Sequence, residues 1–142
     1  MKEVSKAMLE YRVTAKRIDQ SGSEATTKNV SVTLDTSMAG RSDAFNSAEL
    51  LLAAISACMI KGIERVSPMI NFQFSGVDIM LRGERQDSPP MMALIEYELI
   101  VATNETDQRL ELLHTNVQKY GTIFNTIAKA TTIRGSIKRA TP

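Results

Sequence analysis

The sequence predicts an α+β domain whose elements follow in the order two strands, long helix, two strands, helix, strand. Two observations indicate this class. Apolar and polar residues alternate in five short segments, and two longer segments carry apolar residues at helical spacing. With 142 residues the chain is long enough to bury a core of its own, so we expect one domain over residues 1–142. Nothing in the pattern requires a parallel sheet.

The first two strands are expected to form an N-terminal hairpin. Residues 8–19 alternate loosely and predict a half-buried strand, and residues 29–34 alternate again. The turn at residues 20–23 opens a longish loop between them. A polar stretch at residues 35–43 predicts the loop that leads to the long helix.

The long helix is expected to begin at Asn46 or Ser47, either of which can cap its first turn, and to run to Val66. The Ser67-Pro68 pair should then end it. Its first half is apolar on nearly every face, and this apolar surface is larger than one small sheet and one other helix can cover. If one side of this half stayed in contact with water, about four large side chains would be exposed, and burying each one contributes roughly 1.5–3 kcal/mol of free energy. We therefore expect an obligate homodimer with this helix between the protomers.

Two further strands follow the long helix. Residues 74–85 and 95–101 both alternate, and the Ser88-Pro89-Pro90 break separates them. Charged or polar residues occupy every second position, which is typical of an antiparallel hairpin with one buried face. This hairpin should supply the sheet that the helices cover.

The C-terminal part of the chain predicts a second helix over residues 106–120, with Gly121 as its C-terminal cap. A short helical turn at residues 124–128 and a last strand at 131–139 complete the chain. The buried stripe expected on the second helix is Leu110, Leu113, Val117 and Tyr120.

Charge and composition disfavour several classes of function. Seventeen Lys and Arg against sixteen Asp and Glu leave a net charge of +1, so neither a nucleic acid nor a membrane surface is expected as a partner. The apolar run at residues 50–60 is too short to cross a bilayer, and no signal peptide is visible. A single cysteine fits a reducing compartment, so we expect a cytoplasmic protein.

The residues offer few candidates for chemistry. No phosphate-binding glycine loop is present, and the one histidine, His114, is interpreted as a surface or packing residue. We expect neither a cofactor nor a metal site. Cys58 remains. An apolar helix disfavours its thiolate, so a reactive Cys58 needs a nearby cation. Lys61 shares its face but should extend outward, and Arg17 of the first hairpin is the other candidate.

Two segments together resemble the OsmC/Ohr family of osmotically inducible and organic hydroperoxide resistance proteins. Residues 46–58, NSAELLLAAISAC, resemble the family's NPxELLLAALAAC helix, and residues 121–127, GTIFNTI, resemble its CPVxNTL segment. The resemblance implies an intertwined homodimer in which antiparallel sheets wrap around two long central helices. It also implies a thiol peroxidase, with Cys58 in the position that attacks the hydroperoxide.

The sequence departs from the family pattern at the other functional positions. The second cysteine of the family falls on Gly121, so an internal disulfide cannot form, and the family's acidic residue falls on Ala48. Glu49 is adjacent, but nine residues at about 100° each place it on the side of the helix opposite Cys58. We expect Arg17 to occupy the activating arginine position that the resemblance implies.

Two functions from different classes follow. In one, the protein is a one-cysteine peroxidase that acts on organic hydroperoxides, and an external thiol replaces the lost second cysteine. A pocket lined by Leu51, Ile55 and Met59 would then favour bulky apolar hydroperoxides over hydrogen peroxide. In the other, the dimer binds a small apolar or thiol-containing ligand without turnover, and Cys58 only packs.

Overall fold

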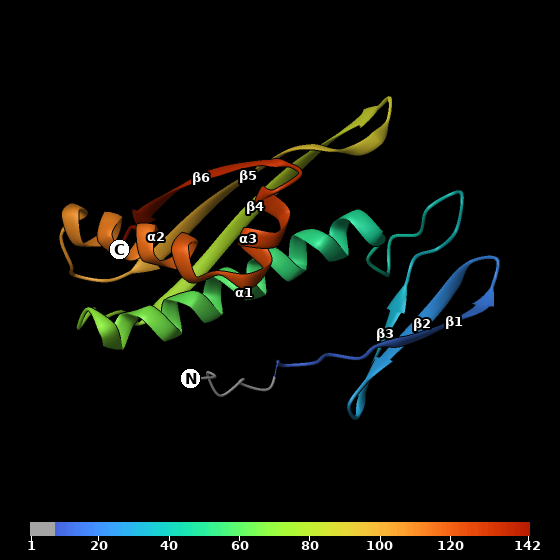
Figure 1. Ribbon diagram of the computed structural model, residues 1–142, viewed down its shortest axis with the longest axis horizontal. Helices are drawn as coiled ribbons and strands as arrows, with labels where there is room; N and C mark the ends of the chain where they lie inside the picture. Colours follow the sequence, from blue (N-terminus) through green and yellow to red (C-terminus); the bar gives the residue numbers. More distant parts are fainter. Residues whose placement is uncertain (1–7) are drawn as a thin grey trace, which may run out of the picture. The chain divides into compact units, whose positions relative to one another are not determined.

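The computed structural model describes residues 8–142 and divides the chain into two compact units, the first ending at Ser47 and the second beginning at Ala48 (Figure 1). Each unit is described by itself. The single domain expected over residues 1–142 stays a prediction.

The first unit is a three-stranded antiparallel sheet in the order β1 (Thr14–Asp19), β2 (Gly22–Thr27), β3 (Val30–Leu34). Two of these strands were predicted, but the middle strand β2 was assigned to a loop. Its residues are small or polar, and it is held by backbone hydrogen bonds to neighbours on both edges. The predicted first strand was also too long, because β1 begins only at Thr14, and it is exposed rather than half-buried.

The register gives this sheet two different faces. Arg17 pairs with Ser23, which pairs with Leu34, so these three residues share one face. The same face carries Val30 and Val32, of which 61% and 41% of the surface is exposed. The opposite face is polar and includes Lys16, Glu24 and Thr33.

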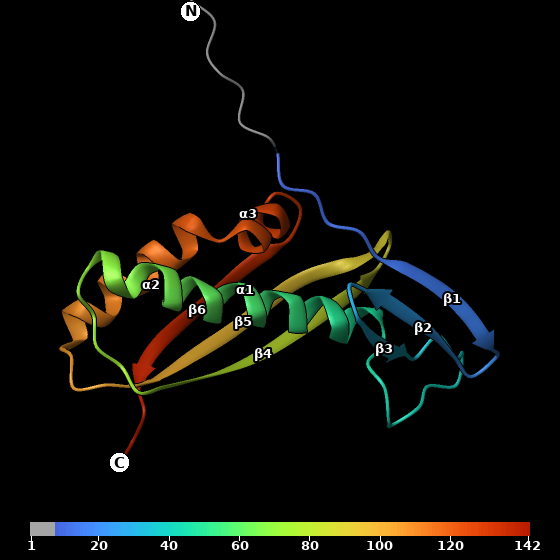
Figure 2. The same cartoon turned by 90° about the horizontal axis from the view of Figure 1, so that it is seen from below.

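The second unit places its helices on one face of a three-stranded sheet (Figure 2). Its elements are α1 (Ser47–Met69), β4 (Gly76–Asp87), β5 (Pro90–Ala102), α2 (Asp107–Tyr120), α3 (Thr122–Ala128) and β6 (Thr132–Arg139). The sheet order is β4-β5-β6. Over residues 8–142, the two units together form a mixed α+β architecture with three helices and two sheets.

The direction of the last strand differs from the expectation. Antiparallel sheets were predicted, and β4 and β5 do form the expected antiparallel hairpin, but β6 runs parallel to β5. The reason is the connection: α2 and α3 carry the chain back to the end of the sheet where β5 begins, so β6 starts beside Leu94.

The core of the second unit lies between the sheet and two helices. Every second residue of β5 faces inward, and α1 and α2 contribute their apolar stripes. The residues that are less than 2% exposed are Ile55, Met59, Ile63, Val66, Ile95, Leu99, Val101, Leu113 and Val117. Tyr120, expected in the stripe of α2, is instead 39% exposed.

The sequence predicts that the Ser67-Pro68 pair ends the long helix. The helix instead continues through this pair to Met69. Pro68 lies in the last turn, where a missing N–H breaks one helical hydrogen bond. The hydroxyl of Ser67 donates to the carbonyl of Ile63 at 2.6 Å, and Ile70 N–H donates to Val66 O at 3.2 Å. These bonds hold the turn on both sides of the proline.

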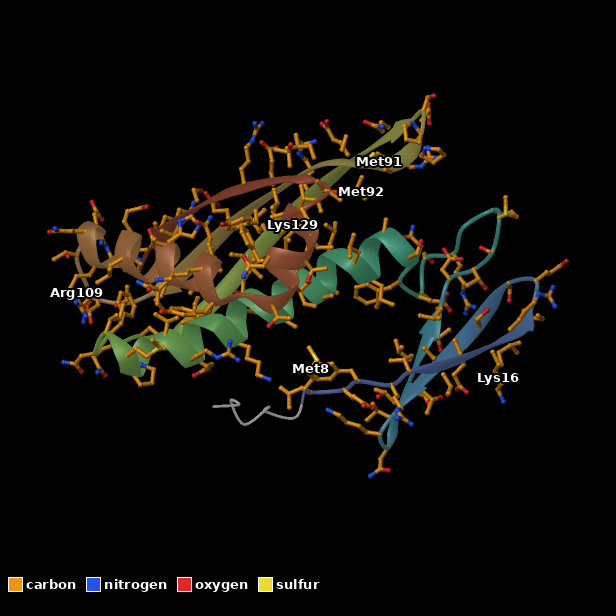
Figure 3. All side chains as sticks on the ribbon, in the orientation of Figure 1. Met8, Lys16, Met91, Met92, Arg109 and Lys129 are labelled. Carbon is orange, nitrogen blue, oxygen red and sulfur yellow. The ribbon has the colours of Figure 1, made fainter. Side chains whose placement is uncertain are left out.

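Arg109, labelled in Figure 3, ties the beginning of α2 to the end of α1. Its guanidinium donates to the carbonyls of Ile70 and Asn71, and it pairs with Glu105 at 2.9 Å. Within residues 8–142 no helix has both the length and the apolar composition to span a bilayer.

Candidate functional site

Cys58 lies in the middle of α1, and its side chain is partly exposed. The helix places it beside Ile55 and Met59, which are 0% and 1% exposed, and one turn before the exposed Lys61. The thiol therefore sits where the buried stripe of α1 gives way to its exposed side.

Gly121 faces Cys58 from the junction of α2 and α3. A Cβ atom built on Gly121 would lie 3.2 Å from the Cys58 sulfur and 3.1 Å from both Phe124 Cβ and the carbonyl oxygen of Val117. Gly121 has φ −82°, so it does not adopt the left-handed conformation expected of a glycine cap. Its lack of a side chain matters because of space, not backbone conformation.

The separation between positions 58 and 121 suits a sulfur–sulfur bond. In a disulfide, the Cβ of one cysteine lies about 3 Å from the sulfur of the other. The 3.2 Å between a Gly121 Cβ and Cys58 Sγ is close to this value. The structure therefore brings together the two positions that the sequence matched to the cysteines of the family, and it leaves one of them without a sulfur.

A cluster of aromatic and polar side chains begins at Phe124, which lies next to Gly121. The Phe124 ring packs edge-on against Tyr97, with 6.4 Å between ring centroids, and Tyr97 packs the same way against His114 at 5.7 Å. Tyr97 Oη lies 2.7 Å from His114 Nε2 and accepts a hydrogen bond from Gln118 Nε2 at 2.6 Å. His114, interpreted from sequence as a surface or packing residue, is thus a buried, hydrogen-bonded part of this cluster.

Burial shifts both titratable groups of the cluster toward their neutral forms. Desolvation lowers the pKa of His114, an effect that the carboxylate of Glu111, 4.0 Å away, only partly opposes. Desolvation likewise raises the pKa of Tyr97.

Arg65 is the basic residue that sequence reasoning missed. Its Nη1 donates to the carbonyl oxygen of Tyr120 at 3.3 Å, at the residue that precedes Gly121. Arg65 follows Cys58 by seven positions, which places both on the same side of α1. That spacing was the available signal.

The remaining predicted site residues lie elsewhere. Arg17 is exposed on β1 of the first unit. Ala48 and Glu49 lie in the first turn of α1, where Glu49 is exposed. The pocket lining expected from Ile55 and Met59 is wrong, because both side chains are buried in the core. Residues 8–142 contain no group of three or more metal-ligating side chains close enough to hold an ion.

Comparison with known proteins gives one family. The family model for OsmC-like protein matches residues 40–135. No curated protein matches the chain.

Solved structures of similar proteins extend over nearly the whole chain. An OsmC-like protein from Mycoplasma pneumoniae has a TM-score of 0.87 at 16% identity, covering 94% of this chain and 99% of that one. An organic hydroperoxide resistance protein from Legionella pneumophila, also described as a predicted redox protein and regulator of sulfide bond formation, has a TM-score of 0.75 at 17% identity, covering 94% and 99%. The organic hydroperoxide resistance protein OhrB of Bacillus subtilis has a TM-score of 0.68 at 17% identity, covering 93% and 100%. At these identities the likeness shows the fold.

Proposed function

We propose that this chain, which belongs to the OsmC-like protein family, is a one-cysteine peroxidase that reduces organic hydroperoxides with an external thiol. Two similar structures are named for organic hydroperoxide resistance. The observation that carries the proposal is the contact between positions 58 and 121, which are as close as disulfide partners although only Cys58 supplies a sulfur, so the second sulfur has to come from outside the chain.

The reaction balances with two external thiols. The Cys58 thiolate attacks the outer oxygen of the hydroperoxide, the O–O bond breaks, and the alkoxide leaves and takes up a proton to become an alcohol. A first thiol condenses with the resulting sulfenic acid, which forms a mixed disulfide and releases water. A second thiol attacks that disulfide, regenerates Cys58 and leaves as the small-molecule disulfide. A reducing compartment such as the cytoplasm supplies such thiols.

The protein is further proposed to act as a homodimer. The first unit exposes large apolar side chains that a stable globule covers, namely Met8, Leu9, Tyr11, Val13, Ile18, Val30 and Val32. A second copy of the chain is the occupant we propose for the apolar face of its sheet. Arg17 shares that face, so covering it would remove the guanidinium from water and carry it toward the covering protomer. Arg17 is the cation that we propose to stabilise the thiolate in this dimer.

The test is hydroperoxide consumption with dithiothreitol as the reductant. Wild type should consume cumene hydroperoxide, and Cys58→Ser should fall to the uncatalysed rate. Cys58 is the one cysteine of the chain, so no other thiol can take its place. Equal rates for wild type and Cys58→Ser would overturn the proposal and favour a dimer that binds a ligand without turnover.

A further inference from the structure

Three basic residues lie on the segments that carry Cys58 and Gly121, and we name Lys61, Arg65 and Lys119 the basic rim. Lys61 lies one turn along α1 from Cys58 and is exposed. Arg65 is anchored on the Tyr120 carbonyl at 3.3 Å. Lys119 places its Nζ 5.4 Å from the centroid of the Tyr120 ring. Arg65 and Lys119 therefore both lie at the last residue of α2, and Lys61 lies on α1 between Cys58 and Arg65.

The basic rim is not neutralised by carboxylates. Among residues 8–142, no carboxylate oxygen lies within 4.0 Å of a charged nitrogen of these three residues; the ion pairs involve other basic side chains. Residues 112–131, which include the end of α2 and all of α3, contain two lysines and no acidic residue. On α1 between residues 50 and 69, Glu64 is the single carboxylate. The surface near Cys58 is therefore locally positive although the chain is nearly neutral.

Building on the proposed function, we propose that the external reductant is a small thiol that carries a carboxylate, and that Arg65 binds this carboxylate. The thiolate enters beside Gly121, attacks Cys58 in its oxidised form and leaves it as a mixed disulfide, with water as the leaving group from the sulfenic acid. The guanidinium has five N–H donors, and one of them donates to the Tyr120 carbonyl, so others stay available for a carboxylate.

The distances suit a molecule of this size. Arg65 Nη1 lies 3.3 Å from Tyr120 O, and a Cβ on the next residue, Gly121, would lie 3.2 Å from Cys58 Sγ. With the bonds between these atoms, the distance from Nη1 to the sulfur is at most about 11 Å. An extended peptide covers about 3.3–3.6 Å per residue, so a thiol and a carboxylate separated by two or three peptide units can reach both groups.

Arg65 also has a purely structural reading, because a cation at the C-terminus of α2 stabilises the helix dipole. The two readings differ in one respect. Removing a capping residue should change the rate of exchange at Cys58 equally for every thiol. Removing a carboxylate-binding residue should slow exchange with anionic thiols more than exchange with neutral ones.

The experiment measures thiol exchange without hydroperoxide. Cys58 is first converted to its mixed disulfide with 2-thiopyridine by 2,2′-dithiodipyridine, an uncharged leaving group whose release is followed by absorbance. Glutathione is the anionic thiol and 2-mercaptoethanol the neutral one, each normalised to its rate with free dithiodipyridine. The matched control is Lys138→Gln, which removes the same charge on the sheet face opposite the helices.

In wild type, the normalised rate with glutathione should exceed that with 2-mercaptoethanol, and Arg65→Gln should lower this ratio about fivefold, the effect of one favourable surface charge pair. Added salt should weaken the preference, and Lys138→Gln should retain it. A ratio that is unchanged in Arg65→Gln, or that falls equally in Lys138→Gln, overturns the inference. Because no hydroperoxide enters the assay, a charge preference without peroxidase activity refutes only the proposed function, and the reverse refutes only this inference.

Discussion

The absence of a side chain at Gly121 determines which sulfur Cys58 can meet. Gly121→Cys should place a second sulfur against Cys58, since the Cβ position lies 3.2 Å from the thiol and its tightest neighbours need to move only a few tenths of an ångström. One equivalent of cumene hydroperoxide should then convert both thiols into an intramolecular disulfide, measured by thiol titration and intact mass. Thiols that stay free in this variant would contradict the geometry of the site.

Thr122→Cys is the matched control for this experiment. It adds a cysteine one residue further on, at the exposed first position of α3. In this variant the new thiol should stay reduced and form no disulfide with Cys58. The comparison would then show that disulfide formation depends on position 121.

His114 makes stability depend on pH because its pKa is lowered by burial. The unfolded chain takes up a proton near the ordinary histidine pKa of about 6.5, whereas the folded protein resists it. Stability should therefore fall as pH drops below about 6.5 and continue falling until the lowered folded pKa is reached. Urea unfolding at a series of pH values measures this slope, and His114→Gln should remove it in that range. Since His114 is the one histidine of the chain, a slope that survives the substitution would contradict this origin.

Some of the site was predictable from residues and some was not. Cys58 and Gly121 were found because their segments resemble a known family. Arg65 shares a helix face with Cys58, but spacing alone does not show that α2 ends beside it. The hydrogen bonds among Tyr97, His114 and Gln118 join β5 to α2, and no local pattern in the sequence records such a pairing.

Among the elements, β6 depends on a glycine at its centre. Gly135 pairs with Tyr97, and a Cβ there would collide with the Tyr97 carbonyl and ring. Tyr97 cannot move aside without losing its hydrogen bonds to His114 and Gln118. Gly135→Ala should lower the free energy of unfolding by about 1–3 kcal/mol, as overpacking does. Denaturant unfolding measures this change.

Gly76→Ala provides the control in the same sheet, because its Cβ would make an ordinary 3.7 Å contact with Ala102. Its unfolding free energy should stay close to that of wild type. Equal losses in the two variants would show that the Tyr97 contact is not the cause.

The elements with strong periodicity were predicted, namely α1, α2 and the β4–β5 hairpin. The strand β2 was missed because its residues lack large apolar side chains, and its pairing on both edges depends on neighbours outside the segment. The parallel direction of β6 was missed because strand periodicity carries no direction. The run of α1 through Pro68 depends on side-chain and backbone hydrogen bonds that compensate for the missing donor.

For the molecule as a whole, the proposed dimer predicts a solution mass of about twice 15.7 kDa. Val32→Glu places a charge on the apolar face of the first sheet and should dissociate the dimer, because burying an unpaired carboxylate there is costly. Light scattering after size exclusion measures the mass. Thr33→Glu adds the same charge to the opposite, polar face of β3 and should stay dimeric. A monomeric wild type, or equal effects of both variants, would contradict the assignment of this face.

The central claim is that Cys58 reduces a hydroperoxide, and the most direct test is to trap its first product. Wild type treated with one equivalent of cumene hydroperoxide in the presence of dimedone should gain one dimedone adduct, which tandem mass spectrometry should place on Cys58. If the thiol stays free and unlabelled while the hydroperoxide remains unconsumed, Cys58 is a packing residue and the peroxidase account is wrong.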